Sequence, residues 1–442
     1  MSTILDHPEA QALLDQTEVS PDSVRSCTRQ LTRFVQRYLP CFDRDEQRRH
    51  ADTILRGKRT GLQRQTTEPM ARHAGQKRRP LHHFVGAGRW DDDAVRTELR
   101  RPVRQELADP DAVLVLDGHG VPKQGDDSCG VDRQWCGRLG QVANCPVGYF
   151  RAYAAPQGQT VVAARLYLTQ ERAQDRRHRQ KTYVPPEVVF QAGGRLGLDL
   201  VRTAGRERPH GWVAGADEFG RASAWRAHLR LDGERYVLDV PSNTLVRDLS
   251  DRRPPVRAGG RERRPVFARA EVWAARQPKG RWRKFRLRDG TKGRRDVKAL
   301  PPWVQTKDAD GCAGPRERLV VLRTWATKPQ TWYTLSNAPQ EVPLVAVVRA
   351  HGERQGVDEL FEDGNQEVGL NHDEVRSWTG WRHHLTLALL ALWFLQLERR
   401  RLGEKKSGGD GSASAADLHG VVAVAAAPDG DDRGPGECGA AA

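Results

Sequence analysis

The first 110 residues place their hydrophobic side chains at helical spacing. The pattern is clearest over residues 23–38 and 91–107, and the second stretch opens with three aspartates, which favour a helix N-terminus because they oppose its partial positive charge. Residues 57–79 form a polar, basic connector between the two stretches. The sequence therefore predicts an N-terminal helical domain over residues 1–110, for which a role in contacting DNA and a plain packing role are both open.

After residue 110 the pattern changes to that of strands. Residues 112–117 are a continuous apolar run that ends in Asp117, which is typical of a buried central strand that presents an acid at its carboxyl end. Two longer strands follow over residues 147–155 and 160–168, and the short turn between them predicts a hairpin.

A second apolar run, over residues 211–217, also ends in a carboxylate, Asp217. This part of the chain is completed by two predicted helices and a strand, over residues 186–204, 219–231 and 235–240. Three strands, a helix, a strand, a helix and a strand follow one another in the order of a ribonuclease H-like mixed sheet. We therefore predict an α/β fold in which a ribonuclease H-like mixed sheet is flanked by helices, with the first part of this core over residues 111–240.

Residues 241–345 interrupt this order. Their second half contains strand-like runs, whereas residues 343–397 return to a helical pattern. We predict a β-rich insertion over residues 241–345 and helices over residues 346–401 that complete the core. The remaining residues, 402–442, are rich in Gly, Ser, Ala and Asp, and we predict a disordered tail because such a segment cannot bury a core.

The distribution of charge predicts a binding function for the insertion. The chain has 72 Lys and Arg residues against 57 Asp and Glu residues, a net charge of +15. Residues 251–298 hold 18 of the basic residues and 5 of the acidic ones, so this window alone carries +13, and aromatic residues are interleaved with its cations. The insertion is therefore predicted to present a basic face to a polyanion. Arg, which supplies most of the positive charge, suits bidentate contacts with phosphate.

Several classes of protein are excluded by what the sequence lacks. Seven cysteines are scattered without a CxxC pair, which argues against a zinc finger or a disulfide framework. The phosphate-binding pattern GxxxxGK[ST] and the zinc-binding pattern HExxH are absent. The N-terminus has no signal-peptide pattern, and the longest apolar stretch, residues 385–397, is too short to cross a bilayer. We expect a soluble, cytoplasmic protein with no membrane partner.

The two strand-terminal aspartates predict a site. If their strands are neighbours in one sheet, Asp117 and Asp217 meet at its edge, and Asp358 or Glu359 on the helix after the insertion supplies a third acid. Clustered carboxylates need cations between them to stay ionised. Two Mg²⁺ ions about 3.5–4 Å apart, with Mn²⁺ as an alternative, would stabilise the attacking and leaving oxygens in a phosphodiester displacement.

Several ordered motifs carry a resemblance to a known family. Residues 115–125, VLDGHGVPKQG, resemble the first-aspartate motif of bacterial insertion-sequence transposases of the DDE superfamily, and residues 212–220, WVAGADEFG, resemble the second. Residues 361–381 and 383–387 resemble the segment that follows the family's catalytic glutamate. The likeness extends over residues 31–397, and the order of the motifs favours a transposase over a generic nuclease of the same fold.

The resemblance implies an activity and a set of site residues. It implies a ribonuclease H-like domain that uses two divalent metals to cut double-stranded DNA at transposon ends and to join the freed 3′-hydroxyl to target DNA. It also implies a homodimer on DNA, in the bacterial cytoplasm and associated with the nucleoid. Asp117, Asp217 and Asp358 match the metal ligands, Glu359 is the substitute third acid, and Arg354 matches a phosphate contact. The further DNA-binding candidates are Lys123 in the first motif and three cations of the insertion, Arg281, Arg283 and Lys284.

Departures from the family pattern leave a second function open. Where the family usually has glutamate, this chain has Asp358, which is one methylene shorter, and Glu359 points about 100° further round the helix. The other departures are Asn365 in place of a lysine, Gln355 in place of an aromatic residue, and Gly118-His119 in place of an acid-plus-hydroxyl pair. The alternative is therefore a catalytically impaired transposase relic that acts only as a DNA-binding protein.

Overall fold

The structure, a computed structural model, describes most of the chain. The described residues are 21–205, 209–250, 267–286, 296–308, 310–325 and 328–406. More than half of the basic window over residues 251–298, and the predicted tail beyond residue 406, lie outside the described residues. Within the described part, no helix has both the length and the apolar character needed to cross a membrane.

The chain folds as two compact units. One unit combines Met1–Leu99 with Glu362–Ala442, and the other is Arg100–Phe361. The chain therefore leaves the first unit, builds the whole second unit and then returns to the first. The finer domain boundaries given above stay a prediction.

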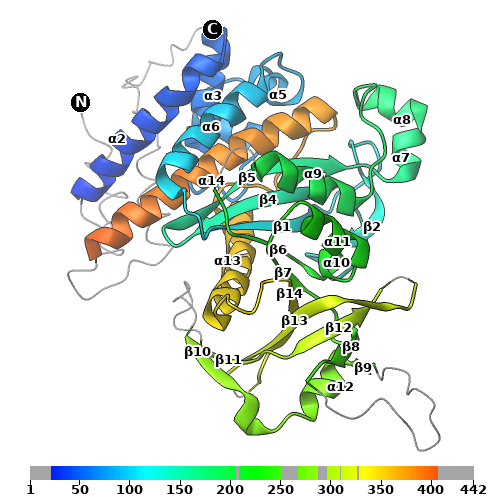
Figure 1. Ribbon diagram of the computed structural model, residues 1–442. Helices are drawn as coiled ribbons and strands as arrows, with labels where there is room; N and C mark the ends of the chain where they lie inside the picture. Colours follow the sequence, from blue (N-terminus) through cyan, green and yellow to red (C-terminus); the bar gives the residue numbers. More distant parts are fainter. Residues whose placement is uncertain are drawn as a thin grey trace, which may run out of the picture. The chain divides into compact units, whose positions relative to one another are not determined.

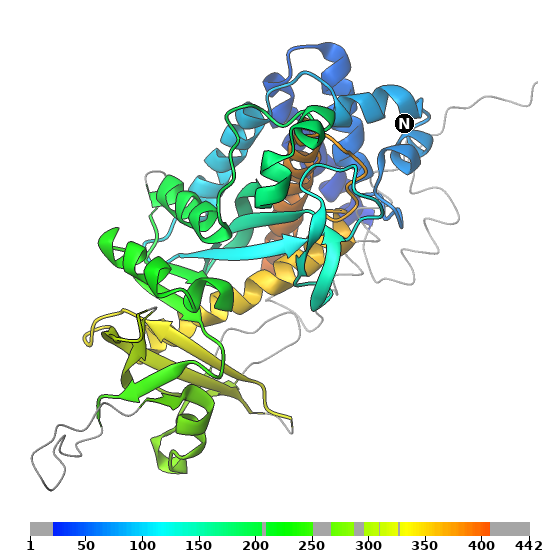
Figure 2. The ribbon, with the colours of Figure 1, turned by 90° about the vertical axis from the view of Figure 1, so that its right-hand side faces the viewer.

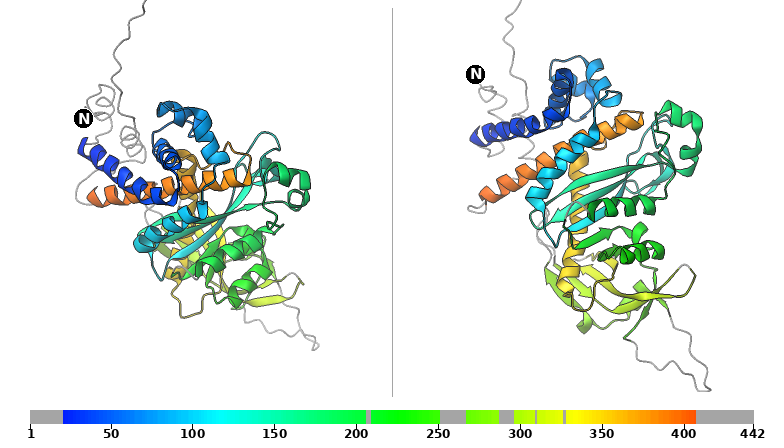
Figure 3. Two further views of the ribbon diagram at one scale, coloured as in Figure 1. Left: turned by 90° about the horizontal axis from the view of Figure 1, so that it is seen from above. Right: turned by 45° about the horizontal axis from the view of Figure 1, so that its top comes forward.

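The first unit is helical, as the spacing of its hydrophobic residues predicts. Its elements are α2 (Pro21–Tyr38), η2 (Leu39–Cys41), α3 (Asp45–Gly57), α4 (Thr67–His73), α5 (Arg78–Gly86), the start of α6 (Asp92–Leu107) and α14 (Trp378–Lys406). Helix α14 contacts α2, α3 and α5 (Figure 3). Its apolar stretch, from Leu385 to Leu395, is buried, so this stretch forms a core helix.

Two predictions in the first unit are corrected. The connector over residues 57–79 contains the helix α4, because Thr67, Met70 and Ala71 give this segment a buried face. Helix α14 continues to Lys406, into the segment predicted as tail, since residues 402–406 include the good helix formers Leu, Glu and Lys.

The second unit is built on a mixed sheet whose core strands lie in the order β5-β4-β1-β6-β7 (Figure 1). These strands are β1 (Val113–Gly120), β4 (Val147–Ala155), β5 (Gly158–Tyr167), β6 (Trp212–Gly215) and β7 (Tyr236–Asp239). Strand β4 runs antiparallel to β1 and β5, whereas β6 runs parallel to β1 and β7. This order and these directions are those of a ribonuclease H-like sheet, so the predicted fold class is confirmed.

Helices cover both faces of these strands. Helices α9 (Gly193–Gly205), α10 (Asp217–Gly220) and α11 (Ser223–Leu231) lie on one face, and α13 (Leu344–Glu367) lies on the other (Figure 2). Leu116 packs with Phe219 and Trp225 in the core on the first face. Because successive side chains of a strand point to opposite faces, Asp117 is directed to the face on which α13 lies.

The two helices predicted between β5 and β7 differ in detail. The helix predicted over residues 219–231 is two helices, α10 and α11. At the end of α10, a Cβ on Gly220 would lie 1.8 Å from the carbonyl oxygen of Asp239, so the close approach of β7 requires glycine there. The helix predicted from residue 186 begins at Gly193, because a turn closed by a hydrogen bond from Val188 N–H to Pro185 C=O precedes it.

The insertion adds strands to the same sheet. Its elements are β8 (Leu245–Asp248), β9 (Ala268–Arg269), α12 (Ala270–Ala275), η3 (Lys279–Arg281), β10 (Arg283–Arg286), β11 (Asp296–Leu300), β12 (Trp303–Lys307), β13 (Ala313–Thr324) and β14 (Thr331–Ser336). Strand β14 pairs with β7, so the sheet continues from the core into the insertion and reaches 12 strands. The predicted β-rich character of the insertion is thus confirmed. Smaller elements outside this sheet are the hairpin β2 (Asp132–Cys136) and β3 (Gln141–Cys145) and the helices α7 (Gln170–Gln174) and α8 (Arg176–Lys181).

Candidate functional site

Three parallel strands bring carboxylates to one edge of the sheet. The pairing of β1 with β6 ends at Leu116 and Gly215, so Asp117 lies directly beyond it, and Asp217 begins α10 just after β6. Asp239 is the last residue of the next parallel strand, β7. The sequence predicted Asp117 and Asp217 and missed Asp239, although the segment YVLD that ends there repeats the same signal of an apolar run before an acid.

Asp117 is half-buried at this edge. Burial raises the pKa of its carboxyl to about 7, with the carboxylates of Asp358 and Glu218 adding to the rise and the cation of Arg354 opposing it. One of its oxygens, Oδ1, accepts a hydrogen bond from the N–H of Gly118 at 3.0 Å. The charged form of Asp117 is therefore poorly compensated, and a cation beside it would stabilise that form.

Arg354, on α13, lies among the carboxylates. Its Nε is 3.2 Å from Oδ2 of Asp239, and its Nη1 is 3.6 Å from Oδ2 of Asp358. Burial lowers the pKa of Arg354, but Asp239, Asp358, Asp117 and Asp217 outweigh burial and raise the pKa above its usual value. The sequence predicted a phosphate contact for this arginine, whose side chain is 15% exposed and has carboxylates as its nearest partners.

Asp239 is a buried carboxylate with several partners. The hydroxyl of Thr334 donates a hydrogen bond to its Oδ1 at 2.9 Å, and Nδ1 of His351 lies 3.3 Å from the same oxygen. Burial raises the pKa of Asp239, but His351, Arg354 and Thr334 outweigh burial, and the pKa lies below its usual value. Asp239 is therefore held in its charged form.

Asp217 and Glu218 follow one another at the start of α10. The carboxylate of Asp217 pairs with Arg221 one turn further on, and its side chain is 47% exposed. Glu218 is exposed, accepts a hydrogen bond from the hydroxyl of Tyr149 at 3.3 Å, and has its pKa raised mainly by partial desolvation. Its Oε1 lies 3.2 Å from the position that a Cβ on Gly118 would take. Glu218 was missed from the sequence, and the absence of a side chain at Gly118 is the signal that could have drawn attention to this space.

Asp358 is the third predicted acid. Its side chain is 51% exposed, it pairs with Arg354 one turn earlier on α13, and its charge acts on the pKa of Asp117. Glu359, the substitute, is the next residue on the same helix and is partly buried. The structure therefore places one of the two candidates, Asp358, within electrostatic reach of Asp117.

Comparison with known proteins gives the family. A family model described as DDE superfamily endonuclease matches residues 37–294, more than half of the chain. The chain belongs to the DDE superfamily of endonucleases. The matched range contains Asp117, Asp217 and Asp239 and ends before α13 begins.

Two named proteins are similar to this DDE-superfamily chain. A probable transposase for insertion sequence element IS701, from Microchaete diplosiphon, is 32% identical over 84 residues, which are 19% of this chain and 22% of that protein. The chain thus matches about a fifth of the length of this relative. A cryo-EM structure of the piggyBac transposase synaptic complex with hairpin DNA aligns over 86% of this chain and 70% of that one, with 11% identity and a TM-score of 0.40. The fold class is assigned from the strand order of the sheet.

The edge of the DDE-superfamily core offers suitable donors for a divalent metal. Its carboxylates are oxygen ligands, which hard cations prefer, and the side chains of Asp217 and Asp358 are about half exposed. In this structure both of these carboxylates pair with arginines. Among the described residues, the three acids whose oxygens all lie within 4.8 Å of one another are Asp91, Asp92 and Asp93.

The acidic triplet at residues 91–93 has a structural role. Oδ1 of Asp91 accepts hydrogen bonds from the N–H groups of Asp93 and Ala94, at 2.9 and 3.1 Å, and so caps α6. Arg96 and Arg382 pair with Asp92 and Asp93. These contacts account for the triplet without a metal.

Four of the predicted DNA-binding cations lie on a loop, in η3 and on the exposed strand β10. The N–H of Lys123 donates to the carbonyl of Asn144 at 2.9 Å, and its Nζ is 3.5 Å from the hydroxyl of Ser128. Arg281 donates to the side chain of Gln277 at 2.5 Å. Arg283 and Lys284 are exposed residues of β10. The basic residues over 251–266 and 287–295 lie outside the part of the chain that the structure describes.

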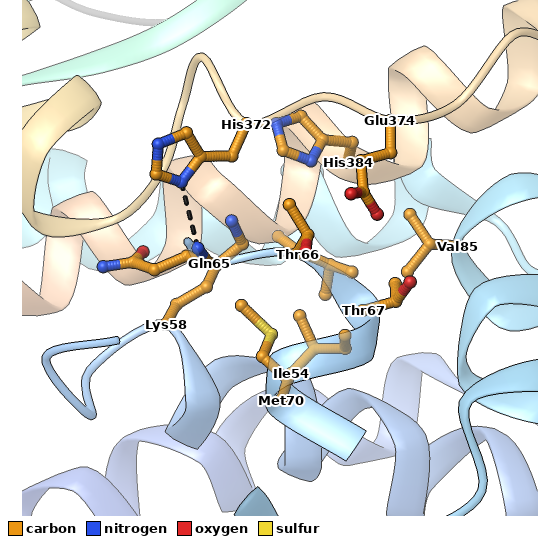
Figure 4. A pocket seen from close by; sticks show the side chains of 11 residues that line it. Ile54, Lys58, Gln65, Thr66, Thr67, Met70, Val85, His372, Glu374 and His384 are labelled. Atoms are coloured by element: carbon orange, nitrogen blue, oxygen red, sulfur yellow. Dashed lines mark hydrogen bonds between the residues drawn. The ribbon is translucent and has the colours of Figure 1, made fainter. Parts of the chain in front are cut away.

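The first unit contains a small pocket that is unsuited to DNA. Its volume is about 20 Å³, which is room for about one water molecule (Figure 4). Lys58 donates from Nζ to the carbonyl of Val368 at 2.8 Å, and burial lowers the pKa of Lys58 to about 7. The N–H of Gln65 donates to Nδ1 of His372 at 3.0 Å (Figure 4). These bonds fasten the segment after α3 to the segment after α13 within this unit.

Proposed function

We propose that this chain is the transposase of an insertion sequence. Its reaction is the cutting of double-stranded DNA at the ends of the element and the joining of the freed 3′-hydroxyl to target DNA. The observation that supports the proposal is the position of Asp117 and Asp217 at neighbouring parallel strand ends, with the charge of Asp358 on α13 acting on Asp117, in a member of the DDE superfamily.

The proposed site residues divide the work of the reaction. Asp117, Asp217 and Asp358 would hold two divalent ions, Mg²⁺ or Mn²⁺, which would supply charge to the attacking and leaving oxygens of the phosphodiester. Glu359 is the substitute ligand if α13 turns about 100° from its present orientation. The chain's own contribution is to hold the backbone of Asp117 and of Asp217 at neighbouring strand ends, so that mainly their side chains remain to be ordered.

DNA is the proposed partner. The candidate contacts are Lys123, Arg354, Arg281, Arg283 and Lys284, together with the helices of the first unit. Binding by clustered cations releases counterions from DNA, so the affinity should fall steeply with added salt. Because two element ends must be processed together, we propose a homodimer on DNA, acting at the nucleoid in a bacterial cytoplasm.

The test is cleavage of a labelled duplex that carries the sequence flanking the element's gene. Asp117→Asn and Asp217→Asn should each lower the cleavage rate about a hundredfold or more, because each removes a metal ligand, while binding in a gel-shift assay stays intact. Asp248→Asn is the matched control, since Asp248 accepts hydrogen bonds from Trp273 and Ser250 in the insertion. Cleavage by the Asp117→Asn variant at the rate of the unchanged chain would refute the site.

A second candidate function is that of an impaired relic that binds DNA without cutting it. The observation in its favour is Asp358, which is a methylene short of the family's glutamate and pairs with Arg354. Restoring the family pattern with Asp358→Glu and Asn365→Lys separates the two candidates. A large gain in the cleavage rate would identify the present chain as the impaired form. Measurable cleavage by the present chain, at a rate equal to that of the restored variant, would support an active enzyme.

A further inference from the structure

We propose that Asp239 is a positioning residue that sets how much of the positive charge of Arg354 falls on the metal-binding carboxylates. This inference rests on the proposed function, because it takes Asp117, Asp217 and Asp358 as the metal ligands. Asp239 itself lies one strand further along the sheet, and the contacts of its two oxygens carry the inference.

Asp239 is fixed by its backbone and by its side chain. It pairs with Thr334 in the ladder between β7 and β14, and the hydroxyl of the same threonine donates to its Oδ1 at 2.9 Å. The side chain of Asp239 is 12% exposed. A carboxylate held in this way can fix the position of the helix that packs against it.

Each oxygen of Asp239 takes a different residue of α13. Oδ1 lies 3.3 Å from Nδ1 of His351, and Oδ2 lies 3.2 Å from Nε of Arg354. His351, Arg354 and Asp358 are spaced by three and four residues, so they share one face of the helix. Asp239 therefore sets the rotation of the helix that carries the third predicted acid.

Arg354 has its charge divided between Asp239 and the site. Its Nε is held by Asp239 at 3.2 Å, whereas its Nη1 makes a looser contact of 3.6 Å with Asp358. A guanidinium beside the site competes with any metal ion for the same carboxylates. Asp239 weakens that competition, because it supplies Arg354 with a counter-charge outside the set of metal ligands.

Substitutions of Arg354 and of Asp239 should therefore change the affinity for a metal ion in opposite directions. We would measure Mn²⁺ binding to the full chain by isothermal titration calorimetry, without DNA. Arg354→Gln should tighten Mn²⁺ binding about tenfold, because it removes the competing charge. Asp239→Asn should weaken it to a similar extent, because the whole charge of Arg354 then falls on the site. A purely structural role for Asp239 gives no reason for the Arg354 variant to bind more tightly.

Further variants separate the possible outcomes. Asp248→Asn should leave Mn²⁺ affinity unchanged, and Asp239→Glu, which keeps the charge, should recover most of the affinity lost in Asp239→Asn. If Asp239→Asn does not fold, the increase in Mn²⁺ affinity expected for Arg354→Gln still decides the matter. Unchanged affinity in Arg354→Gln, or in a folded Asp239→Asn, would overturn the inference. Unchanged affinity in Asp117→Asn as well would instead overturn the metal site on which the proposed function rests.

Discussion

Glu317 and Asp117 are carboxylates of the same sheet whose charges are compensated in opposite ways. Glu317, on β13 of the insertion, is 0% exposed and meets Nε of Arg226 at 3.1 Å, Nη2 of Arg230 at 3.2 Å and the hydroxyl of Tyr236 at 2.5 Å. Asp117, on β1, accepts one backbone hydrogen bond from Gly118, and burial raises its pKa. A fully compensated acid serves the fold, whereas a poorly compensated acid at a sheet edge is available to a ligand.

The network around Glu317 joins two parts of the second unit. Arg226 and Arg230 lie on α11 and Tyr236 lies on β7, all in the ribonuclease H-like core, whereas Glu317 and its neighbour Thr306 belong to the insertion. The network therefore fixes the insertion on the strand that ends in Asp239. Substitutions of Glu317 and of Asp117 test directly whether the two carboxylates differ in this way.

The largest expected effect is that of Glu317→Gln. The change leaves two arginines without their buried counter-charge, so we expect a loss of about 3–5 kcal/mol in the free energy of unfolding. Urea or thermal unfolding measures it, with Glu271→Gln as a control at a partly exposed acid that accepts a hydrogen bond from Ser242. A loss below about 1 kcal/mol would contradict the structural role of Glu317, because Glu317 would then contribute no more than a surface ion pair.

Asp117→Asn should change the free energy of unfolding in the opposite direction, because it should stabilise the chain. The pKa of Asp117 is about 7 in the folded chain, whereas its ordinary value is 3.8, so between these two pH values the folded state holds a proton that the unfolded state has lost. The unchanged chain therefore loses stability as pH rises from about 4 to about 7, and the variant does not. We expect the variant to be about 1–2 kcal/mol more stable at pH 8, after allowance for solvent screening, and equal below pH 4.

Unfolding of both chains in a chelating buffer across this pH range measures the difference. Asp111→Asn, an exposed change near the start of β1, is the control and should show no such dependence on pH. A variant that is less stable than the unchanged chain at pH 8 would mean that Asp117 is a structural acid like Glu317. The proposed difference between Asp117 and Glu317 would then be wrong.

Whether the role of each acid could be predicted from the sequence depends on how far along the chain its partners lie. Asp117 and Asp217 could be predicted because an apolar run that ends in an acid is a local pattern. Glu317 could not, since its partner Arg226 is 91 residues away and meets it only when the insertion joins the sheet. Asp239 ends a similar local run, but its role depends on His351 and Arg354, which lie beyond the insertion.

The fold was predictable to a similar degree. The order of helices and strands predicted the ribonuclease H-like core, because each element has its own hydrophobic period. The division into two units could not be predicted in this way, since it depends on α14 packing against helices that end at least 292 residues before α14 begins. The break between α10 and α11 likewise depends on the approach of β7 to Gly220.

Within the part of the insertion that the structure describes, there are also poorly compensated charges, and they are cations. Lys284 on β10 is directly opposite Lys298 on β11, an arrangement of like charges that destabilises a sheet. Their Nζ atoms lie 4.1 and 4.2 Å from the centre of the ring of Trp325, which is 56% exposed. The ring offsets part of the repulsion. By the reasoning applied to Asp117, this lysine pair is available to an anion.

Lys298→Ala gives the smallest expected effect and extends the comparison to positive charge. The change should raise the free energy of unfolding by a few tenths of a kcal/mol, because it removes a like-charge pair. It should also lower the slope of log affinity for duplex DNA against log salt concentration by about 1, because one phosphate contact is lost. Fluorescence anisotropy at several salt concentrations measures the slope, with Lys328→Ala as the control. If the variant loses stability and keeps its salt slope, the lysine pair serves the fold, and poor compensation identifies binding groups among the acids of this chain but not among its cations.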